Sequence, residues 1–337
     1  MAEIYPSKQL PPFAESYLNY MYTVKGKSAN TVKEYFYDLR IFFRYIYAKE
    51  NNLNYDDDFS VVDFSTDLLN KVTLFDLFSY MAYLRSDRHL ESSGRARKTA
   101  SIKSFFKYCN STAKIIDTNV AAELDSPKIP KRLPKYLELD ESKKLLSSVP
   151  ESGSKFSVRD YCILTLFLNC GLRLSELASI NIKDIRQDSL YVIGKGNKER
   201  TIYLNKSCLE AINSYLAVRP HDKVKDRDAL FLSGRNQRIS VKTIQYIVKK
   251  YLKAAGLDDT KYSVHKLRHT AATLMYQHGH VNIRELQMIL GHESISTTEI
   301  YTHINSDALK SAVNSNPLAD FTVDFPDIDE DIEQFDD

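Results

Sequence analysis

The sequence predicts a mainly α-helical protein with one small β-hairpin, divided into an N-terminal helical unit and a larger mixed unit. Three observations carry this prediction. Apolar residues recur at three- and four-residue spacing along most of the 337-residue chain. One stretch, residues 189–204, instead carries two β-prone runs around a glycine-containing turn. A proline-rich segment at 126–135 interrupts the helical pattern between the two units.

The N-terminal unit, residues 1–125, is expected to be all helical. Ser28 stands where it can cap a long helix whose apolar side chains, from Val32 to Ile46, keep to one face. Residues 51–66 are rich in Asp and Asn and predict a loop. The helical patterns of this unit cover three ranges: 11–50, which divides into two helices, 74–88 and 95–110.

Residues 126–135 form the clearest boundary in the chain. The segment holds three prolines and four basic residues. Because proline disfavours helix at its own position and at the residue before it, the segment predicts an extended linker. Its positive charge would suit a path along a phosphate backbone, although a plain linker explains the composition nearly as well.

The second unit, residues 136–318, combines helices with the hairpin. In the hairpin, Leu190–Ile193 and Thr201–Leu204 are the β-prone runs, and Gly194–Lys198 supplies the turn. Residues 319–337 show no helical pattern and form an acidic tail. The helical patterns of the unit lie near 138–148, 157–170, 206–218, 240–255, 263–278, 282–290 and 305–314.

The charge of the chain is distributed unevenly. The net charge is only +2, but residues 320–337 contain nine acidic residues and no Lys or Arg. The rest of the chain therefore carries 46 basic against 35 acidic side chains, a net charge of +11. A basic body favours a polyanionic partner, although an ordinary solvated surface fits the composition too. The tail is either a solubilising segment, the simpler interpretation, or a mimic of the polyanionic partner that screens the basic surface.

Several classes of protein are not expected. No stretch approaches 18 consecutive apolar residues, so no membrane partner is predicted, and the N-terminus lacks a secretory signal. No Walker-type phosphate loop and no convincing metal-ligand spacing occur, so we expect no cofactor and no metal. Four scattered cysteines indicate reduced thiols and a cytoplasmic location: Cys109, Cys162, Cys170 and Cys208.

Four local groups could carry chemistry, and each also has a structural explanation. Arg173 with Glu176 could be a weak surface ion pair, and His265 could be a core histidine. Tyr301 is one of 22 tyrosines. Together, however, arginines and histidines neutralise a phosphate in its transition state, a tyrosine attacks phosphorus, and a lysine protonates a leaving alkoxide. The groups are Arg173 with Glu176, Lys195 on the hairpin turn, His265-Lys266-Leu267-Arg268-His269, and Leu290-Gly291-His292 with Tyr301.

This set resembles the tyrosine recombinases, and among them the Xer-like recombinases of bacteria. The resemblance covers residues from about 11 to 318. It is strongest at Gly171–Leu177, Gly194–Arg200, His265–His269 and Leu290–His303, which follow in the family's order. Any one of these motifs is weak, whereas the ordered set is specific.

The resemblance implies a role for each side chain. Arg173 and Arg268 would hold the nonbridging oxygens of the scissile phosphate, and His292 would hydrogen-bond to it. His265 would help to accept the proton of Tyr301, the nucleophile.

The general acid toward the 5′ oxygen would come from the hairpin turn. The family pattern favours Lys195, with Lys198 as the competing choice. Glu176 would orient Arg173 or its helix and take no part in the chemistry itself.

At the level of the whole chain, the resemblance implies a site-specific DNA recombinase that cuts and rejoins duplex DNA through a 3′-phosphotyrosyl intermediate and a Holliday junction. The N-terminal core-binding domain and the catalytic domain would form a C-shaped clamp on DNA. Homo-tetramers, or hetero-tetramers with a paralogous recombinase, would exchange a C-terminal segment, here Ala308–Asn314. Chromosome or plasmid dimer resolution is the expected task. The alternatives are a mobile-element integrase, a type IB topoisomerase-like enzyme and a catalytically silent DNA-binding module.

Overall fold

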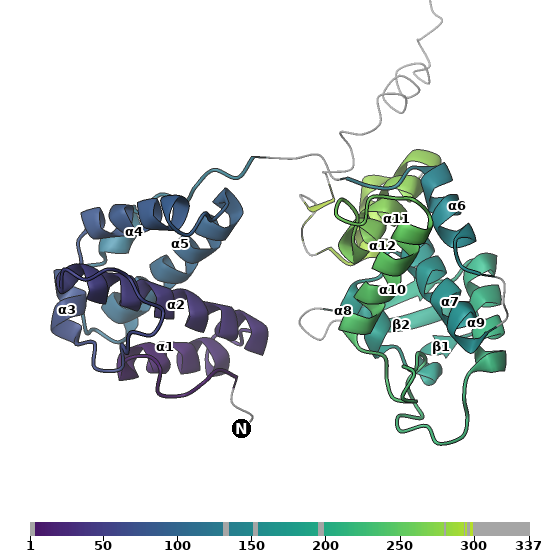
Figure 1. Ribbon diagram of the computed structural model, residues 1–337, viewed down its shortest axis with the longest axis horizontal. Helices are drawn as coiled ribbons and strands as arrows, with labels where there is room; N and C mark the ends of the chain where they lie inside the picture. The colour runs from purple at the N-terminus through teal and green to yellow at the C-terminus, as the bar shows by residue number, and fades with distance from the viewer. Residues whose placement is uncertain are drawn as a thin grey trace, which may run out of the picture. The chain divides into compact units, whose positions relative to one another are not determined.

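The computed structural model describes residues 4–130, 135–150, 154–194, 199–279, 281–292, 294 and 297–298. Contacts along the chain divide it into two compact units, residues 1–131 and 132–337. Figure 1 shows the first unit as a cluster of helices and the second as helices around a small sheet. The predicted fold class, mainly α with a small antiparallel sheet, is therefore confirmed.

The first unit is built around its longest helix. Helix α2 contacts α1, α4 and α5, and its buried side chains meet theirs in a core dominated by aromatic rings, such as the edge-to-face pair Phe43 and Phe105. Such rings bury large apolar areas and add directional contacts. The elements are α1 (Pro12–Thr23), α2 (Ala29–Glu50), α3 (Thr66–Lys71), α4 (Leu74–Ser86), α5 (Ser92–Lys107), the π-helical turn η1 (Tyr108–Thr112) and the 3₁₀ turn η2 (Val120–Glu123).

Local sequence sets where these helices begin. The Ser28 hydroxyl accepts a hydrogen bond from the Thr31 amide, which confirms Ser28 as the cap of α2. Thr73 and Asp76 form a reciprocal capping box at the start of α4. Both devices satisfy amides that the first helical turn leaves without a partner.

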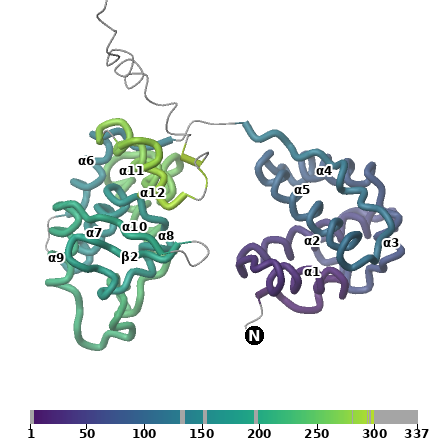
Figure 2. Tube along the Cα trace, turned by 180° about the vertical axis from the view of Figure 1, so that it is seen from behind, coloured from purple at the N-terminus to yellow at the C-terminus, as the bar shows by residue number. Residues whose placement is uncertain are grey.

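The second unit surrounds helix α7, most of whose residues are buried. Helices α9, α11, α6 and α10 all contact it. Figure 2 shows this packing from the opposite side. The helices are α6 (Leu139–Ser147), α7 (Lys155–Cys170), α8 (Leu174–Ser179), α9 (Lys206–Val218), α10 (Val241–Ala254), α11 (Val264–His278) and α12 (Ile283–Leu290), with a 3₁₀ turn η3 (Ile182–Asp184).

The sheet of this unit has three antiparallel strands, β1 (Ile185–Arg186), β2 (Ser189–Ile193) and β3 (Glu199–Tyr203). In the β2–β3 ladder Leu190 pairs with Ile202 and Val192 with Arg200. Leu190, Val192 and Ile202 are buried. The predicted hairpin is therefore present, and the sheet also has the short strand β1, which the sequence analysis did not predict.

The four cysteines are buried free thiols, and two that lie far apart in the sequence meet in space. The sulfur atoms of Cys170 and Cys208 are 3.7 Å apart in the core between α7 and α9. Within the described residues, no helix combines the length and the apolar character that crossing a membrane requires.

Candidate phosphate-binding active site

Arg173 is the residue that caps α8 and the first of the predicted phosphate ligands. The carboxylate of Glu176, one turn later, accepts hydrogen bonds from the Arg173 amide (2.7 Å) and from its Nη1 (2.7 Å). The Arg173 Nη2 donates to the carbonyl of Gly291 at 2.8 Å. Glu176 is only 2% exposed, so the interpretation of this pair as a weak surface ion pair is wrong.

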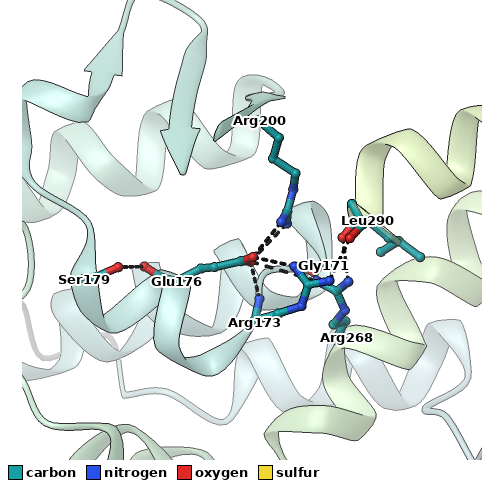
Figure 3. A network of polar contacts seen from close by, with 8 residues as sticks. Gly171, Arg173, Glu176, Ser179, Arg200, Arg268 and Leu290 are labelled. Atoms are coloured by element: carbon teal, nitrogen blue, oxygen red, sulfur yellow. Dashed lines mark hydrogen bonds and ion pairs between the residues drawn. The ribbon is translucent and has the colours of Figure 1, made fainter. Parts of the chain in front are cut away.

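Arg268 lies one α-helical turn after His265 on α11 and is buried. Its Nη1 donates to the carbonyl of Gly171 and its Nη2 to the carbonyl of Leu290, each at 2.6 Å. Both acceptors are at helix ends, where carbonyl groups lack intrahelical partners. Arg268 therefore joins the ends of α7 and α12 (Figure 3).

Glycines end both of those helices in the left-handed conformation. Gly171 (φ +58°) follows α7, and Gly291 (φ +63°) follows α12. A side chain disfavours this conformation, so glycine is the usual residue at such turns. The Gly171 carbonyl accepts a hydrogen bond from Arg268, and the Gly291 carbonyl accepts one from Arg173. These bonds hold the two turns together, and with them Arg173 and His292. The glycines of the Gly-Leu-Arg and Leu-Gly-His motifs are thus structural parts of the site.

Hydrogen bonds hold both the ring and the backbone carbonyl of His292. Its Nδ1 lies 3.0 Å from the hydroxyl of Thr298, which is buried, and its carbonyl accepts a bond from Gln287 Nε2 at 3.1 Å. Burial, with the positive charges of Arg268, Arg173 and other neighbours, lowers the pKa of His292 to about 4. The ring is therefore neutral at neutral pH, and Nε2 remains as the nitrogen available for a ligand.

His265 is exposed to solvent, which excludes its interpretation as a core histidine. Partial desolvation and the charges of Lys266, Arg268 and Arg173 lower its pKa below 6.5. A neutral imidazole at neutral pH is suited to accept a proton. The ring of His269 packs edge-on against it, with ring centroids 4.5 Å apart.

Four of the predicted site residues line one cavity of about 600 Å³. Its apolar walls include Leu172, Val248 and Leu252, and its lining also includes Lys249 of α10 and Asp259, which form an ion pair at 3.3 Å. The predicted residues that line it are Arg173, His265, Arg268 and His292. Cationic and neutral donors that converge on one partly apolar cavity are arranged to bind an anionic group such as a phosphate diester.

The remaining predicted residues, Lys195, Lys198 and Tyr301, lie outside the described residues, as does the segment Ala308–Asn314. Tyr276, the other tyrosine near the His265–Arg268 motif, packs against the small apolar cluster of Ala272, Leu286 and Leu290. Its position is explained by packing. Among the described residues, no group of three or more His, Cys, Asp or Glu side chains has the arrangement of a metal site.

Arg200 also belongs to the site, although its role was not predicted from the sequence. It donates two hydrogen bonds to the carboxylate of Glu176 and its side chain is 12% exposed. A signal was present in the sequence. Strand alternation places Arg200 on the same face as Ile202, and an arginine on a buried face requires an anionic partner.

Comparison with known proteins identifies the family. The family model described as the phage integrase family matches residues 135–307. A tyrosine recombinase XerC of Caldanaerobacter subterraneus subsp. tengcongensis is 54% identical over 312 residues, which cover 92% of this chain and 88% of the relative. A tyrosine recombinase XerD of Proteus mirabilis is 35% identical and covers 88% of this chain and 90% of the relative.

Solved structures agree in fold. The structure of XerH bound to a palindromic difH substrate in a post-cleavage complex has a TM-score of 0.65 and 20% identity, covering 90% of this chain and 94% of that one. The Tn1549 transposon integrase in complex with circular intermediate DNA has a TM-score of 0.63 and 20% identity, covering 90% and 99%. From the family model and the high identity to curated relatives, this chain belongs to the phage integrase family, as a tyrosine recombinase.

Proposed function

We propose that this protein is an Xer-type site-specific recombinase that cuts and rejoins duplex DNA at a defined core site, in the resolution of chromosome or plasmid dimers. The observation that carries the proposal is the convergence of Arg173, His265, Arg268 and His292 on one cavity. The names and the extent of similarity of the XerC and XerD relatives support the Xer type.

In the proposed reaction, the Tyr301 hydroxyl attacks the scissile phosphorus. Its proton passes to His265, which is neutral at neutral pH. The bond from phosphorus to the 5′ oxygen breaks, and Lys195 protonates that oxygen, so the products are a 3′-phosphotyrosyl ester and a free 5′ hydroxyl.

Arg173, Arg268 and His292 stabilise the negative charge that develops on the nonbridging oxygens during this step. Arg173 is suited to this role because its side-chain hydrogen bonds to Glu176 and Gly291 engage only two of the five N–H donors of its guanidinium. Rejoining reverses the step: a 5′ hydroxyl from the partner strand attacks the ester and Tyr301 leaves. The ester retains the energy of the cleaved bond, so no nucleotide is required.

We assign the DNA-binding roles by unit. Residues 1–125 serve as the core DNA-binding domain and residues 136–318 as the catalytic domain, with 126–135 as the basic linker between them. Recombination between two duplexes cuts all four strands, one tyrosine for each cut, so we propose a tetramer on DNA, composed of this chain alone or with a paralogue. The reaction takes place in the cytoplasm, where the chromosome is located.

The proposal is tested in two steps. Mapping the DNA bound in cells should show one cluster near the replication terminus, and the bound sequence supplies the core site. A suicide substrate, nicked beside the cleavage point of that site, should then trap wild-type protein covalently. Tyr301→Phe should trap none and keep its affinity in gel shifts within about threefold, because the substitution removes one oxygen and keeps the ring. Tyr276→Phe is the matched control and should trap normally; the reverse pattern would overturn the assignment of the nucleophile.

A further inference from the structure

We infer that Arg200 is a positioning residue for strand cleavage, which acts through Glu176 to hold the guanidinium of Arg173 in place. The inference rests on the proposed function, in which Arg173 binds the scissile phosphate. Arg200 itself belongs to strand β3, on the far side of the Glu176 carboxylate from Arg173 (Figure 3).

Arg200 grips both oxygens of Glu176. Its Nη1 donates to Oε1 at 2.6 Å and its Nη2 to Oε2 at 3.0 Å. The Nε of Arg200 is buried and has no hydrogen-bond partner among the described residues. Within that part of the chain, the guanidinium therefore donates hydrogen bonds to Glu176 alone. A two-point contact of this kind fixes the rotation of a carboxylate as well as its position.

The same carboxylate holds Arg173 on its other side. Oε2 accepts the Arg173 amide and Oε1 accepts its Nη1, both at 2.7 Å. Each oxygen of Glu176 is thus shared between the two arginines. If Arg200 is removed, the carboxylate keeps its bonds to Arg173 but loses the two that hold it from the side of β3, so the orientation of the Arg173 guanidinium is less restricted.

Arg200 also packs against the residue that holds the opposite edge of Arg173. Gly291 accepts a bond from Arg173 Nη2 through its carbonyl. A Cβ at Gly291 would lie 2.9 Å from the Arg200 Cδ, so the two residues are in direct contact. Arg200 therefore supports both partners of the Arg173 guanidinium, Glu176 and the turn before His292.

The charges favour the same role. Burial raises the pKa of Glu176, but the bonds from Arg200 and from the Arg173 amide outweigh it, and the pKa remains below its usual value. The carboxylate is therefore ionised, and the trio Arg200, Glu176 and Arg173 keeps a net positive charge toward the cavity. Without Arg200, Glu176 neutralises Arg173 and weakens its attraction for a phosphate.

The experiment measures the rate of covalent capture on the suicide substrate at saturating protein. We expect Arg200→Ala to cleave about 100-fold more slowly than wild type, the effect of displacing a catalytic group from its aligned position. Arg200→Lys keeps the positive charge but lacks the two-point contact of a guanidinium. Its cleavage rate should lie between those of wild type and Arg200→Ala. Arg200 and Glu176 act on Arg173 as one unit. The double variant Arg200→Ala with Glu176→Gln should therefore cleave at a rate within about threefold of the slower single variant.

Two controls separate positioning from stability and from the hairpin lysine. Arg159→Ala removes an ion pair to Asp160 that is as well buried, with side chains 8% and 4% exposed, elsewhere in the same unit. At temperatures below its melting point, the Arg159→Ala variant should cleave at a rate within about threefold of wild type. A substrate with sulfur in place of the 5′ bridging oxygen needs no general acid, because a thiolate leaves without a proton. The Arg200→Ala deficit should persist on this substrate.

The outcomes distinguish the two proposals. If wild type forms no covalent adduct, the proposed function fails, and the role of Arg200 fails with it. If wild type forms the adduct and Arg200→Ala matches its rate, only the inference about Arg200 is overturned. Restoration of the Arg200→Ala rate by the sulfur substrate would also overturn it, since the defect would then lie in Lys195 on the hairpin turn and not in Arg173.

Discussion

At Arg173 the local fold and the proposed chemistry depend on the same side chain. The residue caps a short helix through Glu176, reaches a carbonyl at the end of α12, and lines the cavity. Its backbone and its guanidinium are both fixed before any substrate arrives. Such preorganisation is how a site stabilises developing charge without having to rearrange during the reaction.

Removing this guanidinium should therefore affect cleavage more than binding. We expect Arg173→Ala to lower the rate of covalent capture by about 100-fold or more, on the order of 3 kcal/mol of transition-state stabilisation. Gel-shift affinity should stay within a few-fold, because the basic body provides many other phosphate contacts. Equal losses of affinity and rate would show instead that Arg173 binds the ground state and the transition state alike.

The pH dependence follows from His265. Its pKa is lowered from the ordinary 6.5, so the neutral ring persists to a lower pH than in a free imidazole. As the pH falls through this lowered pKa the ring is protonated and can no longer accept the Tyr301 proton. The capture rate at subsaturating DNA should therefore decline on an acid limb whose midpoint lies below pH 6.5. A profile between about pH 5 and pH 8 measures it, and a midpoint near pH 7 would contradict the assignment.

The individual residues of the site were predictable to different degrees. Arg173, His265, Arg268 and His292 were predicted from motif order, and the structure brings them together. Arg200 was not given a role, because its importance depends on which face of β3 is buried and on a carboxylate 24 positions away. The burial of Glu176 likewise depends on tertiary packing, which helical spacing alone does not reveal.

Among the elements, the helices of eight or more residues were predictable and the shortest elements were not. Helices such as α2, α7 and α10 extend over several turns, so their apolar spacing is visible in the sequence. Helix α3 has six residues and strand β1 has two. Neither is long enough to display a period, and both exist because neighbouring elements pair or pack with them.

The glycine turn after α12 provides a test at the scale of the element. Alanine at Gly291 would have to adopt the left-handed conformation, at a cost of about 1–2 kcal/mol, and its Cβ would collide with Arg200. We expect Gly291→Ala to lose thermal stability and also to lower the capture rate, because the Arg200 contact and the Arg173 acceptor both shift.

The matched control is Gly256→Ala. Gly256 has a similar φ of +66°, but its added Cβ would meet only the end of Lys144, at 3.7 Å. It should lose comparable stability by calorimetry while the folded protein keeps a wild-type capture rate. If both variants reduced the rate equally, the effect of Gly291 would be general destabilisation and not a disturbance of the site.

At the scale of the whole molecule, charge governs the encounter with DNA. The chain outside the acidic tail carries a net charge of +11. Binding should release counterions, so the logarithm of affinity should fall linearly with the logarithm of salt concentration, by about 10³-fold or more between 50 and 200 mM if six or more phosphates are neutralised. Fluorescence anisotropy on a duplex measures the slope, and a nearly flat plot would exclude a phosphate-dominated interface.

The same titration with residues 320–337 deleted tests the two interpretations of the acidic tail. Nine negative charges that compete with DNA would make the deleted protein bind nonspecific duplex more tightly at low salt. An unchanged affinity would support a solubilising segment.

The division of the chain into units depends on simple signals. The boundary between residues 131 and 132 falls within the basic, proline-rich segment 126–135. Proline interrupts helices, and its positions are visible in the sequence, so a linker at 126–135 could be predicted from the sequence alone.

The central claim is that Tyr301 becomes covalently joined to DNA. Trypsin digestion of the trapped complex tests it directly, because the expected peptide Glu285–Lys310 contains Tyr301 as its single tyrosine, and the preceding peptide His269–Arg284 contains only Tyr276. After nuclease treatment, mass spectrometry should find the residual phosphonucleotide on Glu285–Lys310. A nucleotide on His269–Arg284, or on any other peptide, would contradict the assignment of Tyr301 as the nucleophile.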